Sequence, residues 1–229
     1  MLLGILGGTL DPIHCGHLDA AEAARTRLGL QEVWMMPARV PPLRADPPVA
    51  SAAHRFAMAA LAVNGRAHLR ASDLELRREG PSYTWDTLQQ LYTLGYNRSQ
   101  IFFITGVDAI LKIATWYRYP ALLEACHFVA VTRPGVSAGT LAEALPEAAD
   151  RVVAASLTSN RETRVVAERC RIWLVDAPTA AVSSTDVRHL AARGEPLDGL
   201  VPSLVATHIR QHNLYRSTPD PAGDLHDQD

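Results

Sequence analysis

Short apolar segments alternate with longer segments of helical period, and this alternation limits the possible fold more than any other feature. Six runs have the length and side chains of strands, several of them apolar on both faces: 2–6, 32–36, 67–74, 101–105, 128–132 and 172–175. Segments 18–28, 53–63, 84–94, 119–126 and 136–150 have helical character, whereas 157–164 is polar and is expected to be a loop. Buried strands separated by helices predict an α/β fold, a doubly wound parallel sheet with helices on both faces.

The length and composition favour a single domain. The chain has 229 residues, of which 48% are hydrophobic, enough to bury one large core. We expect this domain to span residues 1–216, with a C-terminal helical part at about 183–214. Residues 217–229 are acidic and poor in apolar side chains, so we expect a disordered tail.

Charge and cysteine content limit the partners and the compartment. The net charge is −2, so no basic face for nucleic acid is predicted and a small-molecule substrate is favoured. No segment approaches the ~18 apolar residues of a membrane span, and the amino terminus lacks a positively charged lead. The three cysteines, Cys15, Cys126 and Cys170, are odd in number and widely spaced. These features predict a cytoplasmic protein without a disulfide framework, and they leave a homo-oligomer open.

The turn after the first strand has the composition of an anion site. It has the sequence GGTLDPIHCGH, from Gly7 to His17. In a doubly wound sheet the ligand lies beyond the carboxyl ends of the strands, where glycine allows close approach and a helix N-terminus attracts phosphate. His14 and His17 are three residues apart, so they are expected to project to one side, toward that anion. Phosphate charge nearby would favour the protonated form of both imidazoles.

Two other interpretations of this turn are disfavoured. A closed zinc site at His14, Cys15 and His17 would require a fourth ligand, and no second cluster follows. We therefore expect no metal-binding residues. The glycines do not have the GxGxxG spacing of dinucleotide-binding dehydrogenases, and this argues against an oxidoreductase.

A second anion site is predicted near the other end of the chain. The segment VSSTDVRHLAARG, residues 182–194, begins with hydroxyl residues, continues with helical period and ends on glycine. Ser183, Ser184 or Thr185 can cap this helix, and Arg188 lies on its first turn, where its guanidinium can bind phosphate oxygens. Together they favour a triphosphate site, with two helix N-termini facing one another across a cleft.

These two motifs carry a resemblance to a known family. With GPSYTWDTL at residues 80–88, the chain resembles the bacterial nicotinate-nucleotide adenylyltransferases of the nucleotidyltransferase superfamily. Further matches occur at 41–44, 54–55, 106–109, 116 and 133–135, so the similarity runs from residue 1 to about residue 215. The resemblance implies a Rossmann-like nucleotidyltransferase fold. It also implies transfer of AMP from ATP to nicotinate mononucleotide in NAD biosynthesis, with Mg²⁺ bound by the nucleotide.

The resemblance also implies site residues. His14, His17 and Arg188 would be catalytic. ATP would be bound by Gly7, Gly8, Thr9, His14, His17, Asp108, Arg133, Ser183, Ser184, Thr185 and Arg188. The mononucleotide would be bound by Gly8, Thr9, Arg44, Tyr83, Thr84, Trp116 and Tyr117, with its pyridinium ring stacked on Trp116 and its carboxylate at the amides of Tyr83 and Thr84. Asp108 would bind a ribose hydroxyl or, alternatively, cap the next helix.

Departures from the family pattern leave alternatives open. Leu10 replaces a usual phenylalanine, Arg44 replaces a usual lysine, and the connection at 136–171 is longer. Two alternatives remain: an adenylyltransferase for nicotinamide mononucleotide or another phosphate acceptor such as phosphopantetheine, and a nucleotide-binding sensor without turnover. Intact histidines and Arg188 disfavour the sensor, and the 80–88 motif disfavours phosphopantetheine.

Overall fold

One parallel sheet runs through the molecule. The computed structural model of the chain describes residues 1–42, 46–132, 137–155 and 169–216. In these ranges seven strands pair in the order β3-β2-β1-β4-β5-β7-β6, and every pair is parallel. The strands are β1 (Leu3–Gly8), β2 (Glu32–Pro37), β3 (Leu69–Ala71), β4 (Ile101–Gly106), β5 (His127–Thr132), β6 (Val152–Ala154) and β7 (Ile172–Asp176).

Helices cover both faces of this sheet, as predicted. One core cluster joins Leu6 and Val33 of the sheet to apolar side chains of α1, α2, α6 and α7. The other joins Leu3 and Ile5 to α3, α4 and α5. The helices are α1 (Cys15–Leu28), α2 (Ala52–Ala62), α3 (Thr84–Thr93), α4 (Val107–Ile110), α5 (Ala138–Ala144), α6 (Ser184–Ala192) and α7 (Ser203–Gln211), with 3₁₀ helices η1 (Ile113–Thr115), η2 (Ala121–Glu124) and η3 (Pro146–Arg151).

The strand order places a switch point between β1 and β4. These strands are neighbours, pairing from Leu3 with Ile101 to Leu6 with Ile104. β2 and β3 follow on one side, and β5, β7 and β6 on the other. Ligands of doubly wound sheets bind where such an order reverses, beyond the carboxyl ends of the strands. Gly8 and Gly106 lie at those ends, so a ligand is expected to bind at the loops that follow them.

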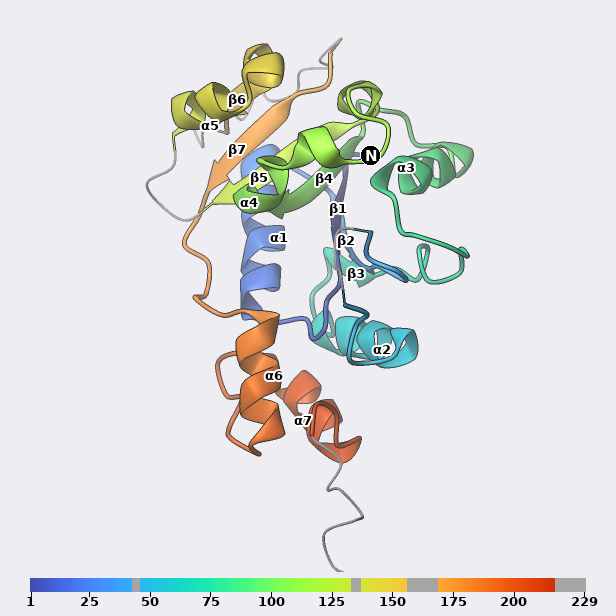
Figure 1. Cartoon of the computed structure of the whole chain (residues 1–229), viewed down its shortest axis with the longest axis vertical. Coiled ribbons are helices and arrows are strands. Elements are labelled where there is room, and N and C mark those ends of the chain that lie inside the picture. The colour runs from blue at the N-terminus through green and yellow to red at the C-terminus, as the bar shows by residue number, and fades with distance from the viewer. Residues whose placement is uncertain (43–45, 133–136, 156–168, 217–229) are drawn as a thin grey trace, which may run out of the picture.

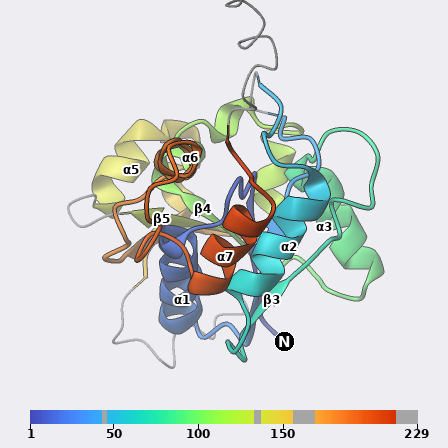
Figure 2. The ribbon, with the colours of Figure 1, turned by 90° about the horizontal axis from the view of Figure 1, so that it is seen from below.

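The two C-terminal helices lie together at one end of the molecule (Figure 1). α7 packs side by side with α2, as the view from below shows (Figure 2). This contact brings residues from opposite halves of the sequence together. No helix among the described residues is long and apolar enough to cross a membrane.

Three predictions of secondary structure are corrected. Helix α1 begins at Cys15 rather than at residue 18, because His14 is its N-cap. The helix predicted at 119–126 is only the 3₁₀ helix η2, directly after Pro120. The single helix predicted at 136–150 is wrong: α5 ends at Ala144, Pro146 begins η3, and the strand β6 then pairs with β7. The three residues of β6 are too few for a periodic signal.

Several predictions fall wholly or partly outside the described residues. They are the polar loop at 157–164, the tail at 217–229, the longer 136–171 connection and the site residues Arg44 and Arg133.

Candidate active site

The two glycines at the end of β1 have different reasons to be glycine. A Cβ added to Gly7 would lie 2.7 Å from Cζ of Phe103, which no ordinary packing allows. A Cβ on Gly8 would meet only Cδ2 of Leu10, at 3.8 Å. Gly7 is therefore required by the packing of β1 on β4, whereas Gly8 leaves its backbone accessible to a ligand.

The two histidines of the loop lie together, as predicted. Their rings are stacked with centroids 3.7 Å apart and planes 28° apart. The backbone N–H of His14 donates to Nδ1 of His17 at 3.2 Å. Because Nδ1 of His17 accepts this hydrogen bond, the proton of the neutral ring lies on Nε2, which becomes a donor. In the described part of the structure, Nδ1 of His14 is buried and has no hydrogen-bond partner.

Gly16 lets another segment of the chain approach this pair. A Cβ at Gly16 would lie 3.1 Å from the carbonyl oxygen of Ala180 and 3.2 Å from Nδ1 of His14. The N–H of Ala180 donates to Oδ2 of Asp19, in α1, at 2.8 Å. The segment that leads into α6 is thus held against the first turn of α1, and a side chain at Gly16 would separate them.

Burial keeps both imidazoles neutral in the protein alone. It lowers the pKa of His14 to about 4, although Asp186 and Asp19 act in the opposite direction. The pKa of His17 is lowered well below its usual value, first by burial and then by His14. Protonation of this pair therefore depends on an anion brought by a ligand.

The N-terminus of α6, which we call the second helix opening, has the predicted cap; the first is the N-terminus of α1. Oγ of Ser183 accepts the N–H of Asp186 at 3.1 Å, and Oδ2 of Asp186 accepts the N–H of Ser183 at 3.2 Å. Ser183 is therefore the N-cap of α6, and the carboxylate of Asp186 completes a reciprocal capping box. The hydroxyl of Thr185 accepts a hydrogen bond from Nη2 of Arg188 at 3.1 Å.

The two helix openings are direct neighbours. Oγ of Ser184 donates to the carbonyl oxygen of Pro12 at 2.9 Å, and Nη1 of Arg188 donates to the carbonyl oxygen of Asp11 at 2.8 Å. Two hydrogen bonds thus join the loop before α1 to the first turn of α6. The two predicted anion sites therefore lie side by side and in contact, rather than facing one another across a cleft as predicted.

Two buried charged residues that carried no predicted role support the loop. The Asp11 carboxylate is fully buried and accepts the N–H groups of Val49 and Ala50, at 2.7 and 3.1 Å, and the Tyr215 hydroxyl, at 2.9 Å. Arg55, which is 1% exposed, donates to the carbonyl oxygens of Thr9 at 2.9 Å and of Ala38. The conformation of the loop is therefore fixed from α2 and from the C-terminal segment.

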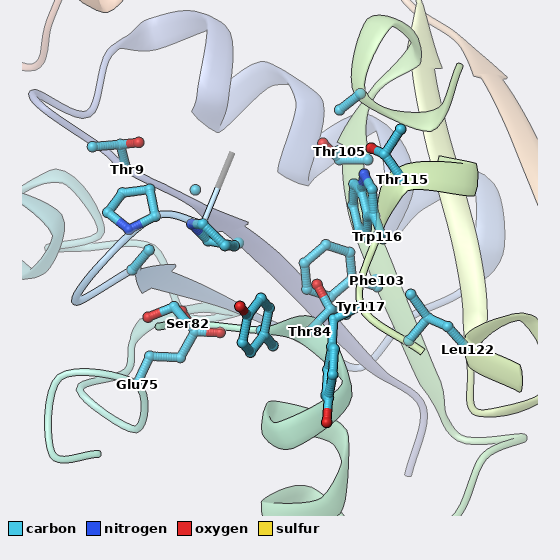
Figure 3. Close-up of a pocket in the computed structure, with 17 residues that line it drawn as sticks. Thr9, Glu75, Ser82, Thr84, Phe103, Thr105, Thr115, Trp116, Tyr117 and Leu122 are labelled. Carbon is cyan, nitrogen blue, oxygen red and sulfur yellow. The ribbon is translucent and has the colours of Figure 1, made fainter. Parts of the chain in front are cut away.

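A cavity of about 530 Å³ opens beside the loop. Thr9, Ser82 and Glu75 lie on one side of it and Trp116 on the other (Figure 3). Seven predicted site residues line the cavity: Gly7, Gly8, Thr9, Tyr83, Thr84, Trp116 and Tyr117. Its lining also includes residues without a predicted role, among them Glu75, Ser82, Phe103, Thr105 and Thr115.

The far wall of the cavity is aromatic. Trp116 is half-buried and packs edge-to-face on Phe103 and Phe128, at 5.9 and 6.1 Å between centroids. Tyr117 lies against Tyr83, with centroids 4.5 Å apart. Since the neighbours of Trp116 contact it edge-to-face, its ring is fixed in orientation, as stacking with a flat ligand requires.

Glu75 is a buried acid in this cavity. It is 4% exposed, and Oε1 accepts a hydrogen bond from Oγ1 of Thr87 at 2.6 Å. Burial raises the pKa of Glu75 to about 7, against the opposing effects of Thr87, Arg78 and Ser82. No sequence signal singled it out, because it directly follows the segment 67–74, which is predicted to be a strand; the strand β3 in fact covers only Leu69–Ala71.

Asp108 and the predicted absence of metal ligands complete the comparison with the sequence. Asp108 is exposed in α4, and Gly106 is the N-cap of that helix, so the alternative that Asp108 is the cap is wrong. Within the ranges that the structure covers, no three His, Cys, Asp or Glu side chains converge, as they stand, on a metal position. The donors of the loop are imidazoles, hydroxyls and a guanidinium, which suit phosphate oxygens better than a bare Mg²⁺ ion.

The chain is similar to proteins of one enzyme family. A family model described as cytidylyltransferase-like matches residues 5–190. A probable nicotinate-nucleotide adenylyltransferase of Moorella thermoacetica is 40% identical over 218 residues, which cover 95% of this chain and 93% of the relative. A protein of the same name from Thermoanaerobacter sp. is 38% identical over 214 residues, covering 93% and 94%.

A solved structure has the same fold. The nicotinic acid mononucleotide adenylyltransferase of Plasmodium falciparum, complexed with NaAD, superposes with a TM-score of 0.69 at 20% identity, covering 93% of this chain and 96% of that one. From the family model and from relatives that match nearly its whole length, the chain belongs to the cytidylyltransferase-like family and, within it, to the nicotinate-nucleotide adenylyltransferases.

Proposed function

We propose that the protein transfers AMP from ATP to nicotinate mononucleotide, giving nicotinate adenine dinucleotide and pyrophosphate for NAD biosynthesis. The observation that carries this proposal is the direct contact between the two helix openings, through Ser184 with Pro12 and Arg188 with Asp11. This contact gathers donors for a polyphosphate at one place, next to a cavity with an aromatic wall. The enzyme acts in the cytoplasm on small molecules and not on nucleic acid, as one domain over residues 1–216.

The reaction needs no carboxylate base. The second pKa of a phosphate monoester is about 6, so the mononucleotide phosphate is largely a dianion at neutral pH. One of its oxygens attacks the α-phosphorus of ATP. The bond from that phosphorus to the bridging oxygen breaks, and pyrophosphate leaves with both electrons of that bond. Catalysis then consists of alignment and of neutralising the charge that develops.

The residues divide between the phosphates. His17, through its Nε2–H, and His14 donate to the α-phosphate, and phosphate charge raises their affinity for a further proton. Arg188 and the first turn of α6, at Ser183, Ser184 and Thr185, bind the β- and γ-phosphates. Arg188 already donates to Asp11 and Thr185, so it is held in position and needs little reorganisation to receive phosphate.

ATP reacts as its complex with a divalent cation, and we propose Mg²⁺. The donor groups of the loop suit phosphate, so the nucleotide and water would hold most of the coordination sphere. The cation supplies charge neutralisation at the phosphates. Asp108 and Arg133 complete the ATP site, with Asp108 at a ribose hydroxyl.

The acceptor occupies the cavity beside Gly8 and Thr9. Its pyridinium ring stacks on Trp116, next to Tyr117. The amide of Tyr83 donates to the carbonyl oxygen of Pro81 at 3.0 Å. The amide of Thr84, in the first turn of α3, has no acceptor among the described residues, so it is the better donor to the nicotinate carboxylate. Arg44 contacts the acceptor phosphate.

The direct test measures pyrophosphate release from ATP and Mg²⁺ with either nicotinate or nicotinamide mononucleotide. We expect rapid release with the acid, and a preference for the acid of at least about tenfold in kcat/KM, because a donor built for a carboxylate loses its partner with the amide. A preference for the amide would support the alternative acceptor. No release with either acceptor would support a sensor.

A further inference from the structure

Three histidines form a cluster away from the active-site cavity. His54 lies in the first turn of α2, and His208 and His212 lie at the end of α7, where the two helices pack (Figure 2). The ring centroids are 5.3 Å apart for His54 and His208, 4.9 Å for His54 and His212, and 4.4 Å for His208 and His212. None of the three lines the cavity.

The rings of His54 and His208 face one another through one nitrogen atom each. Nδ1 of His54 lies 3.1 Å from Nε2 of His208. Two imidazole nitrogens bound to one metal at about 2.0–2.1 Å, with an angle of 90–110° between them, are separated by about 2.9–3.4 Å. Their ring centroids are then about 4.5–5.2 Å apart, a range that includes the 4.9 Å between His54 and His212 and lies near the 4.4 Å between His208 and His212. The 5.3 Å between His54 and His208 is longer, as for two rings that point at one another along a hydrogen bond. Both rings must therefore turn before their nitrogens face one metal ion.

The third ring is placed to join them. His208 and His212 are four residues apart, so their side chains leave the same side of the helix. The same spacing is used by helical histidine pairs in zinc enzymes. As the rings stand, no nitrogen of His212 completes a three-ligand set. His212 is exposed, so rotation about its side-chain bonds can bring a nitrogen to that point.

The ligand type limits which metal can bind. An imidazole binds a metal ion through the lone pair of its unprotonated nitrogen. Imidazole donors favour zinc, nickel and copper over magnesium and calcium.

We propose that His54, His208 and His212 form a binding site for one divalent transition-metal ion, Zn²⁺ or Ni²⁺, that joins α2 to α7. This revises the expectation that the chain has no metal ligands. The site connects two elements that hold the first loop: α2 carries Arg55, which binds the Thr9 carbonyl, and Tyr215 follows α7 and binds Asp11. Metal binding at this place stabilises both supports together.

The test uses the full chain without an affinity tag and does not depend on activity. Zn²⁺ is titrated into metal-free protein by calorimetry at neutral pH, and thermal unfolding is followed with and without the ion. We expect one equivalent to bind and the melting temperature to rise. The affinity falls at least about tenfold in His54→Gln and in His208→Gln, each of which removes one ligand. His68→Gln, at an exposed histidine outside the cluster, leaves the affinity unchanged.

Each contrary outcome overturns the site. If no ion binds, the contact between His54 and His208 is only a hydrogen bond between neutral rings. If an ion binds equally well to the His54→Gln and His208→Gln variants, its ligands lie elsewhere. Melting curves of the metal-free variants show whether each one folds, so a lost site is distinguished from a lost structure. Activity with ATP and nicotinate mononucleotide can fail or persist without changing these results.

Discussion

The hydroxyl of Tyr215, near the end of the described chain, donates to Oδ1 of Asp11, in the first loop, at 2.9 Å. Asp11 is fully buried, and its other partners are the N–H groups of Val49 and Ala50. Three segments distant in sequence therefore meet at one carboxylate. The carbonyl oxygen of the same residue accepts a hydrogen bond from Arg188, so the C-terminal segment and the proposed triphosphate site share a support.

Removal of the Tyr215 hydroxyl tests whether its hydrogen bond to Asp11 stabilises the first loop. In Tyr215→Phe the buried carboxylate loses one of the donors that the described residues supply to it, which costs about 1–3 kcal/mol of unfolding free energy. We expect a lower midpoint in urea and a reduced kcat, because the loop loses a constraint. Tyr96→Phe is the matched control, since no hydrogen bond is described for its hydroxyl. Equal stability of Tyr215→Phe and the parent protein would show that the contact contributes nothing.

Gly16 is predicted to be intolerant of even a methyl group. The added Cβ would press on the Ala180 carbonyl and on His14, at 3.1 and 3.2 Å. Gly16→Ala should therefore push the Ala180 carbonyl or the His14 ring aside by a few tenths of an ångström. We expect a lower kcat, with a loss smaller than the about 10²-fold expected for a misplacement of about 1 Å. Gly139→Ala, in α5, is the control, because its Cβ would meet only Oγ of Ser137 at 3.5 Å. Normal turnover in Gly16→Ala would exclude this packing role.

Glu75 should make stability depend on pH. Its pKa is about 7 in the folded protein, raised from 4.5 by burial, so the folded state binds the proton more tightly than the unfolded state. The stability that this difference contributes is fully present below pH 4.5 and is lost as the pH rises to about 7. Glu75→Gln lacks this titration and keeps an acceptor for Thr87.

The measurement is the unfolding free energy of both proteins between pH 4.5 and 8. We expect Glu75→Gln to gain stability relative to the parent protein as the pH rises. Glu79→Gln, at an exposed position, should follow the parent protein throughout. A constant difference between Glu75→Gln and the parent protein would contradict a raised pKa for Glu75.

Substitution of Trp116 should weaken binding of the acceptor, nicotinate mononucleotide, and leave binding of ATP nearly unchanged. Loss of a desolvated cation–π contact of about 2 kcal/mol corresponds to a rise of about 30-fold in KM for nicotinate mononucleotide. Steady-state kinetics of Trp116→Ala should show this rise with little change in KM for ATP, and Trp116→Phe should recover part of the affinity. An equal rise for both substrates would refute the stacking role.

The sequence predicted the sheet and both helix openings because these depend on local patterns. The apolar runs are continuous, and the glycines, histidines and hydroxyl residues adjoin the strands and helices that they serve. Arg55 shows a signal that could have been used: it lies at the start of the buried stripe of α2, three and four residues before Met58 and Ala59. An arginine on such a stripe must find partners inside the protein.

Other features depend on contacts that no local pattern contains. The Tyr215 hydroxyl meets Asp11 only after α7 has packed on α2. Glu75 is buried, and its carboxylate meets Thr87 of α3, only in the folded chain. The edge strand β6 has three residues and is recognised only by its pairing with β7. Tertiary contact alone decides each of these.

His17 should contribute through a single nitrogen. Its Nδ1 accepts the N–H of His14, so Nε2 is the atom left to donate to the α-phosphate. The side-chain nitrogen of glutamine can occupy the place of Nε2, whereas asparagine is too short to reach it. We therefore expect His17→Asn to lose about 10²–10³-fold in kcat, as expected for one lost donor at a developing charge. His17→Gln should retain more activity than His17→Asn, with both variants folded by thermal unfolding. Equal losses in the two variants would exclude the Nε2 donor as the contribution of His17 and would favour a role for its stacking on His14.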